Sequence, residues 1–132
     1  MAMHFAAIIT LLALSLFTIT VVWVGAARIK YGVKAPATTG NENFERIFRV
    51  QMNTLENLVL FLPALWLFNY YVSPLWTGIL GLVWLLGRVD YALSYARSAE
   101  ARSRGYGISA LAFLALAVGA AVGIVLRIIA GL

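Results

Sequence analysis

The sequence predicts an all-α integral membrane protein, a four-helix bundle, and three observations favour that fold class. Hydrophobic residues make up 63% of the 132 residues and charged residues only 11%, against about 25% in soluble domains. The mean hydropathy is +0.91. Long apolar segments alternate with short polar ones that carry most of the basic residues. Because a bilayer core excludes charged side chains, the apolar segments are predicted to cross it as helices. Residues 1–132 are then a single domain without a sizeable soluble part.

The first predicted helix covers about residues 5–28. Residues 5–27 contain no charged side chain, and a helix of that length crosses about 30 Å of hydrocarbon. A cleaved secretory signal is the alternative. It would begin with positive charges and have a shorter apolar core, whereas the positive charges here follow the apolar segment. We therefore expect this helix to be retained as a membrane span.

The second predicted helix covers about residues 44–71, after a polar loop that contains Gly32, Pro36 and Gly40. Such residues interrupt regular structure. The second half of the helix is apolar, but the first half is rich in charged and amide side chains: Glu45, Arg46, Arg49, Gln51, Asn53 and Glu56. Ionisable groups at membrane depth are costly and usually have a partner or a function. This segment is therefore the first candidate for a functional site.

The third and fourth predicted helices cover about residues 75–99 and 107–129. Gly78, Gly81 and Gly87 lie in the third helix, and small residues let membrane helices approach closely. The fourth helix is rich in alanine and glycine and has no charge before Arg127. The loop after the first helix and the loop after the third are basic, whereas the link between the second and third has no basic residue. The positive-inside rule therefore places both basic loops in the cytoplasm.

Two polar stripes are predicted to meet at that membrane face. Arg49, Asn53 and Glu56 follow an i, i+4, i+7 spacing, which puts them on one face of a helix. The spacing of the second stripe is i, i+4, i+7, i+11, so its members share a face if the third helix continues that far: Tyr91, Tyr95, Ser98 and Arg102. Guanidinium groups bind carboxylates, and a glutamate binds an ammonium. The residues therefore favour a site for a charged small molecule, anionic or zwitterionic.

Composition excludes several other classes of site. The sequence has no cysteine and a single histidine, His4, so it offers no cysteine nucleophile and no metal cluster. The net charge of +5 is typical of nucleic-acid-binding proteins, but here the basic residues flank apolar spans, which favours membrane orientation. No nucleic-acid partner is expected.

One alternative to a ligand site stays open, in which the charges pair among themselves: Arg49 with Glu56 or Glu45, and Arg88 or Arg97 with Asp90.

A thiol is one ligand whose chemistry this arrangement would change. A free thiol has a pKa near 8.5 and is mostly protonated at neutral pH. A guanidinium beside it, partly shielded from water, stabilises the thiolate and lowers that pKa. The thiolate can then attack an electrophile that is dissolved in the bilayer.

Two segments carry a resemblance to a known family: F-E-R-I-F-R-V-Q-M-N-T-L-E-N at 44–57 and R-V-D-Y-A-L-S-Y-A-R-S-A-E-A-R-S at 88–103. With T-T-G at 38–40, they resemble the MAPEG family, membrane-associated proteins in eicosanoid and glutathione metabolism. The similarity covers nearly the full chain and is greatest to the branch of leukotriene C synthase and microsomal glutathione transferase. The resemblance implies a homotrimer in membrane lipid, with glutathione bound between subunits at the cytoplasmic side.

The resemblance also implies a role for each matching residue. Arg102 matches the arginine that activates the glutathione thiol. The residues that match glutathione contacts from one subunit are Arg49, Asn53, Glu56, Tyr91 and Tyr95. Arg28 and Gln51 match contacts from the neighbouring subunit, although Arg28 alone would be interpreted as a membrane-interface anchor. Two positions depart from the branch: Asn57 replaces a tyrosine that contacts glutathione, so that contact is altered, and Ile29 replaces a second functional arginine.

These departures favour a bacterial, broad-specificity glutathione transferase of the inner membrane over a specialised leukotriene synthase. Glutathione is its expected co-substrate, a lipophilic electrophile the second substrate and glutathione peroxidase activity a further option, with no metal. Two alternatives remain: a lipid-binding or scaffold protein of the same fold without activity, and a small channel or transporter whose pore the polar stripes line.

Overall fold

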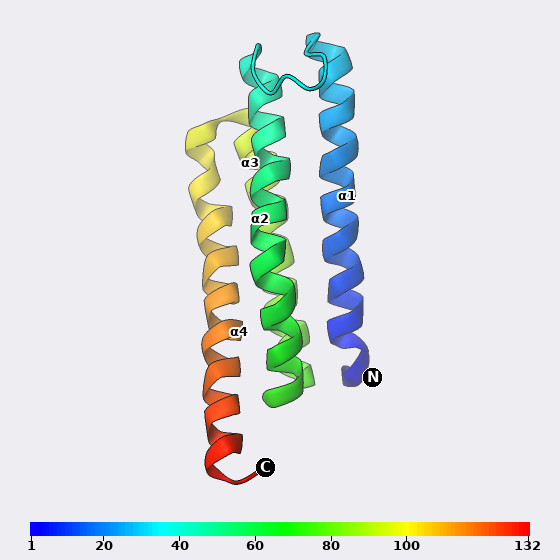
Figure 1. Cartoon of the computed structure of the whole chain (residues 1–132). Coiled ribbons are helices and arrows are strands. Elements are labelled where there is room, and N and C mark those ends of the chain that lie inside the picture. Colours follow the sequence, from blue (N-terminus) through cyan, green and yellow to red (C-terminus); the bar gives the residue numbers. More distant parts are fainter.

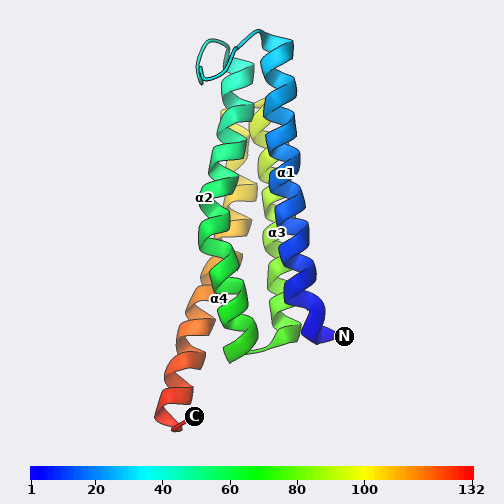
Figure 2. The same ribbon diagram turned by 45° about the vertical axis from the view of Figure 1, so that its right-hand side comes forward.

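Four long helices run up and down in alternation in the computed structural model, which describes all 132 residues (Figure 1). Their bounds are α1 Phe5–Tyr31, α2 Glu42–Tyr71, α3 Pro74–Arg97 and α4 Ser103–Ile129. Two short 3₁₀ turns, η1 (Ala2–His4) and η2 (Ala99–Arg102), precede α1 and α4. Helices α2 and α3 form the centre, with α1 and α4 on either side of this pair (Figures 1 and 2). The predicted all-α four-helix fold is confirmed.

The ends of the helices follow from local chemistry and differ from the predicted bounds by up to four residues. Helix α1 extends beyond residue 28 until Gly32, whose positive φ of 67° ends it. Helix α2 begins before residue 44 because the side-chain oxygen of Asn41 accepts hydrogen bonds from the backbone N–H groups of Asn43 and Phe44. Ser73 caps α3 in the same way, and the extended backbone at Ser98 ends it before residue 99.

The start of α4 differs most from the prediction. It begins at Ser103, whereas the sequence favours a start near residue 107. Gly105 was predicted to end the loop, but it lies inside the helix. The turn between α3 and α4 is therefore shorter than expected, which brings the beginning of α4 close to the end of α3.

Three stretches are long and apolar enough to cross a membrane: Ala2–Tyr31, Pro74–Arg97 and Ala99–Ile129. They make the chain a multi-pass integral membrane protein. Helix α2 is as long as the others but carries charged residues through its first half. Its second half supplies much of the largest core cluster, in which Phe61 stacks on Trp84 at 3.8 Å between ring centres. The other part of α2, toward the two basic loops, has a smaller apolar core and more polar contacts.

The backbones of α3 and α4 touch at a pair of glycines. A Cβ atom added to Gly105 would lie 2.4 Å from the backbone nitrogen of Tyr91 and 2.6 Å from the carbonyl oxygen of Gly87. Such distances are shorter than any normal contact, and the nearby atoms are backbone, which cannot rotate away. The predicted role of Gly87 in close packing is confirmed, and Gly105 is its partner. This contact fixes α4 against the part of α3 that carries Tyr91.

We expect Gly105→Ala to destabilise the protein by about 1 to 3 kcal/mol, because the added methyl group forces α3 and α4 apart. Thermal unfolding of the detergent-purified protein measures the effect. Gly107→Ala is the matched control, since a Cβ atom there meets nothing within 4 Å, and alanine favours a helix. Equal melting temperatures for the two variants would contradict the proposed packing.

Candidate functional site

A cleft of about 470 Å³ lies among α2, α3 and the beginning of α4. The two basic loops lie at one end of the bundle (Figure 1), and the cleft is at that end because Arg102, in the turn after α3, lines it. Its lining is mainly polar and aromatic: Arg49, Asn53, Tyr91, Tyr95, Arg102, Ser103 and Tyr106. Both predicted stripes therefore contribute to one concave surface, which also takes residues from the turn after α3.

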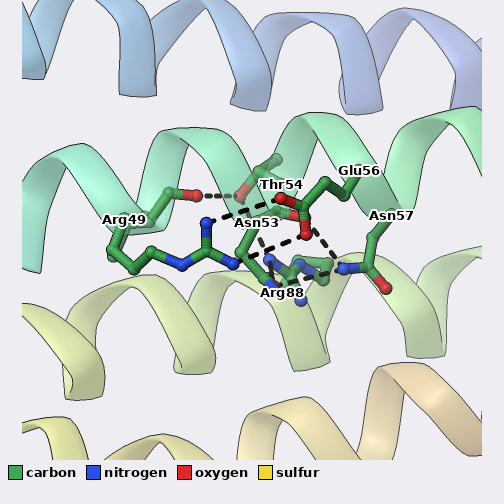
Figure 3. A network of polar contacts seen from close by, with 7 residues as sticks. Arg49, Asn53, Thr54, Glu56, Asn57 and Arg88 are labelled. Carbon is green, nitrogen blue, oxygen red and sulfur yellow. Dashed lines mark hydrogen bonds and ion pairs between the residues drawn. The ribbon is translucent and has the colours of Figure 1, made fainter.

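Helix α2 supplies one wall of the cleft. Arg49 and Asn53, four residues apart, line it, and Glu56 lies one turn further along. Arg49 Nη1 and Glu56 Oε1 form an ion pair at 3.4 Å, with side chains 46% and 56% exposed (Figure 3). Of the pairings considered for Arg49, the one with Glu56 is present. Glu45 instead accepts a hydrogen bond from the backbone nitrogen of Gly40 at 3.3 Å.

The second wall is aromatic and comes from α3 and α4. The rings of Tyr91 and Tyr95 stack with centres 5.5 Å apart. The centre of the Tyr106 ring, on α4, lies 6.3 Å from the centre of the Tyr91 ring. Tyr91 is buried and Tyr95 half-buried. Their stacked rings form a flat apolar surface, and the hydroxyl groups at its edge can form hydrogen bonds.

Arg102 lines the cleft, but it does not lie on α3 as the sequence predicted. The continuous stripe through Ser98 is wrong, because α3 ends at Arg97 and the Ser98 side chain donates to Glu100 instead. Arg102 lies at the end of η2, where its Nη1 donates to the carbonyl oxygen of Ala99 at 2.7 Å. Its guanidinium carbon is 5.5 Å from the centre of the Tyr95 ring. The two ion pairs of the chain are Arg49–Glu56 and Arg104–Asp90, so Arg102 has no carboxylate partner.

Arg88 lies beneath the cleft and is 0% exposed. Its Nη2 donates to Asn53 Oδ1 at 2.8 Å and to Thr54 Oγ1 at 3.2 Å (Figure 3). Its guanidinium carbon lies 4.2 Å from the centre of the Tyr91 ring. The pairing of Arg88 or Arg97 with Asp90 is therefore wrong, since Asp90 binds Arg104. Asp90 is two residues from Arg88, which on a helix places it on another face.

Four of the predicted site residues do not line the cleft. Glu56 is joined to it through Arg49. Asn57 donates from Nδ2 to the carbonyl oxygen of Asn53 at 2.8 Å and to its Oδ1 at 3.2 Å. Arg28 donates to the carbonyl oxygen of Ala37 at 2.7 Å and so holds the first loop. Gln51 is half-buried on α2, outside the cleft.

Two residues that line the cleft were not predicted from the sequence, Ser103 and Tyr106. Tyr106 follows Arg102 by four residues, a spacing that places both on one helical face. The predicted start of the fourth helix at residue 107 concealed this relation. Thr54, which accepts from Arg88, was also missed, because a single buried threonine gives no signal in the sequence.

The arrangement can hold an anionic or zwitterionic molecule. Two guanidinium groups, from Arg49 and Arg102, and the Asn53 amide are donors, and the tyrosine rings provide an apolar wall. No group of three or more metal-binding side chains comes together in the structure. The two guanidinium groups give the cleft a positive charge, which can stabilise the anionic form of a bound molecule.

Comparison with protein families gives a match to the MAPEG family over residues 5–122. The chain belongs to the MAPEG family. The match includes all of α1, α2 and α3, together with η2 and most of α4. All residues of the cleft therefore lie in the MAPEG region of the chain.

Individual relatives agree with this assignment. An uncharacterized protein from Synechocystis is 54% identical over 118 residues, which are 89% of this chain and 86% of that protein. Human microsomal glutathione S-transferase 2 is 42% identical over 93 residues, 70% of this chain but only 63% of the human protein. Bovine leukotriene C4 synthase is 38% identical over 116 residues, 88% of this chain and 77% of the bovine protein. The predicted MAPEG family and its branch are confirmed.

Proposed function

We propose that this MAPEG protein is a membrane glutathione transferase, in which Arg102 activates the thiol of glutathione. The observation that carries the proposal is that Arg102 lines a polar cleft and has no carboxylate partner. Relatives that carry the name microsomal glutathione S-transferase 2 support the same chemistry. Glutathione peroxidase activity of the same thiolate belongs to the proposal.

The proposed chemistry needs only a positioned charge. A lowering of the thiol pKa by two units corresponds to about 2.7 kcal/mol of stabilisation of the thiolate. The thiol loses its proton to water, and the sulfur then attacks a lipophilic electrophile that enters from the bilayer. A carbon–sulfur bond forms, and the leaving group departs with the electron pair of the bond that breaks. Arg49, Asn53, Tyr91 and Tyr95 hold the tripeptide, since they supply donors along the cleft.

The proposed assembly is a homotrimer, in which Arg28 and Gln51 of a neighbouring subunit complete the site. The exposed charges of Arg49 and Glu56, at 46% and 56%, support a covering subunit, because charged groups facing lipid are costly. The mass of the detergent-purified protein distinguishes a trimer from a monomer.

We also propose that α2 is the fourth membrane span and that the cleft faces the cytoplasm. The two basic loops lie at the same end of the bundle (Figure 2), and the cleft includes residues of the loop between α3 and α4. The positive-inside rule assigns that end to the cytoplasm. In a bacterium this membrane is the inner membrane.

Glutathione titration of the detergent-purified protein, followed at the ultraviolet absorbance band of the thiolate, tests the proposed function. We expect the band to appear at neutral pH and to saturate with glutathione. A lipid-binding or scaffold protein would show no band. A channel or transporter would also show none, and reconstituted protein would instead pass ions or solute.

A substitution of Glu56 tests its proposed role in binding. We expect Glu56→Gln to weaken glutathione binding about tenfold, because it removes the charge-assisted interaction of the carboxylate with the ammonium group of glutathione. Turnover at saturating glutathione should change by less than about twofold, because this interaction is distant from the sulfur. Steady-state kinetics with varied glutathione separate the two quantities. Unchanged affinity would mean that Glu56 acts only as the structural partner of Arg49.

A further inference from the structure

The side-chain oxygen of Asn53 is held by two donors from different helices. Arg88 Nη2 on α3 donates to it at 2.8 Å, and Asn57 Nδ2 on α2 donates at 3.2 Å (Figure 3). An amide nitrogen cannot accept a hydrogen bond, so the atom that receives both donors is the oxygen. The orientation of the Asn53 amide is therefore determined by its surroundings.

The nitrogen of the same amide is free. Asn53 Nδ2 makes no hydrogen bond in the chain, and the buried polar atoms without a partner are Asn69 Oδ1, Arg88 Nε and Arg88 Nη1. Asn53 Nδ2 is therefore accessible, and its side chain lines the cleft. The site thus presents an amide NH₂ donor beside the guanidinium of Arg49.

We infer that Arg88 and Asn57 are positioning residues that fix the Asn53 amide so that its NH₂ group donates to a carboxylate or carbonyl oxygen of the bound tripeptide. This inference rests on the proposed function. Arg88 is fully buried beneath Asn53, and Asn57 reaches the site only through Asn53. Neither side chain lines the cleft, so both act through Asn53 and not on the ligand.

The inference gives Asn57 a role different from that of the residue it replaces. The family resemblance implies a tyrosine that contacts glutathione at this position, whereas the Asn57 amide donates to the backbone and side-chain oxygens of Asn53. In place of a direct contact from position 57, the chain therefore has the NH₂ group of Asn53, one helical turn away, in a fixed orientation.

A double-mutant cycle between Asn53 and Asn57 tests the inference, with the dissociation constant of glutathione as the readout. Asn53→Ala should weaken binding about tenfold and Asn57→Leu about fivefold, both within the range for the loss of one ordinary hydrogen bond. If Asn57 acts only through Asn53, the double variant binds within about twofold of Asn53→Ala. Turnover at saturating glutathione should change by less than about twofold in each. Asn69→Ala, which removes an amide near the other end of α2 whose oxygen has no partner, should bind like wild type.

Three results overturn the inference. Independent effects, with the double variant about fiftyfold weaker than wild type, mean that Asn57 contacts the ligand or acts elsewhere. Wild-type affinity in Asn57→Leu means that the Asn53 amide needs no support from it. Wild-type protein that binds no glutathione overturns the proposed function together with the inference, and this failure is recognised before any variant is made. If Asn57→Leu does not fold, Asn57→Asp replaces it, since a carboxylate of the same size accepts but does not donate.

Discussion

Replacement of Arg102 by alanine is expected to lower turnover about 100-fold and to remove most of the thiolate absorbance at neutral pH, because the site loses its one positioned charge without a partner. Arg102 is exposed, held by the carbonyl oxygen of Ala99 and stacked near Tyr95. Its loss leaves no buried group unsatisfied, so the fold should be retained. Absorbance titration with glutathione and turnover with a lipophilic electrophile measure the two effects.

Arg97→Ala is the matched control for this experiment. It removes the same charge from an exposed residue at the end of α3, outside the cleft. We expect it to retain the thiolate band, whereas Arg102→Lys, which keeps the charge but not the guanidinium geometry, should restore only part of it. If Arg97→Ala and Arg102→Ala lose the band equally, general positive charge activates the thiol and the assignment of Arg102 is wrong.

The fold was predictable because burial in a bilayer leaves a strong signal in the sequence. Apolar segments of membrane-spanning length can only be helices or strands of a closed barrel, and their length favoured helices. The two side-chain caps, Asn41 and Ser73, are residue types that favour the start of a helix. The helix ends near glycine were less predictable, because glycine serves both as a breaker and as a packing surface. Gly105 is such a case: its role depends on Gly87, a contact across helices.

The candidate site was predictable only where it follows helical periodicity. Arg49 with Asn53, and Tyr91 with Tyr95, line the cleft because residues four apart share a face. Ion pairs were harder to predict, because the sequence does not determine which neighbouring helix faces each charge. Arg104 lies at the beginning of α4, and only the short turn after α3 brings it to Asp90. The burial of Arg88 is likewise a property of the packed bundle and not of its sequence neighbours.

Arg88→Met is expected to raise the melting temperature of the protein by about 5 °C and to weaken glutathione binding about tenfold. Arg88 is 0% exposed and has no carboxylate partner, and two of its nitrogen atoms lack hydrogen-bond partners. A charged side chain in a membrane interior costs about 3 kcal/mol. Methionine fills similar space without that cost.

The substitution leaves the surrounding polar atoms satisfied, which is why stability should rise. Asn53 Oδ1 still accepts from Asn57 Nδ2, and Thr54 Oγ1 still donates to the carbonyl oxygen of Val50 at 2.7 Å. Affinity should nevertheless fall, because a single donor holds the Asn53 amide less firmly. Arg127→Met, at the far end of α4, is the control and should give neither a gain in stability nor a loss of affinity. A lower melting temperature with wild-type affinity would make Arg88 a structural residue. A higher melting temperature with weaker affinity would mean that this buried charge lowers stability and serves ligand binding.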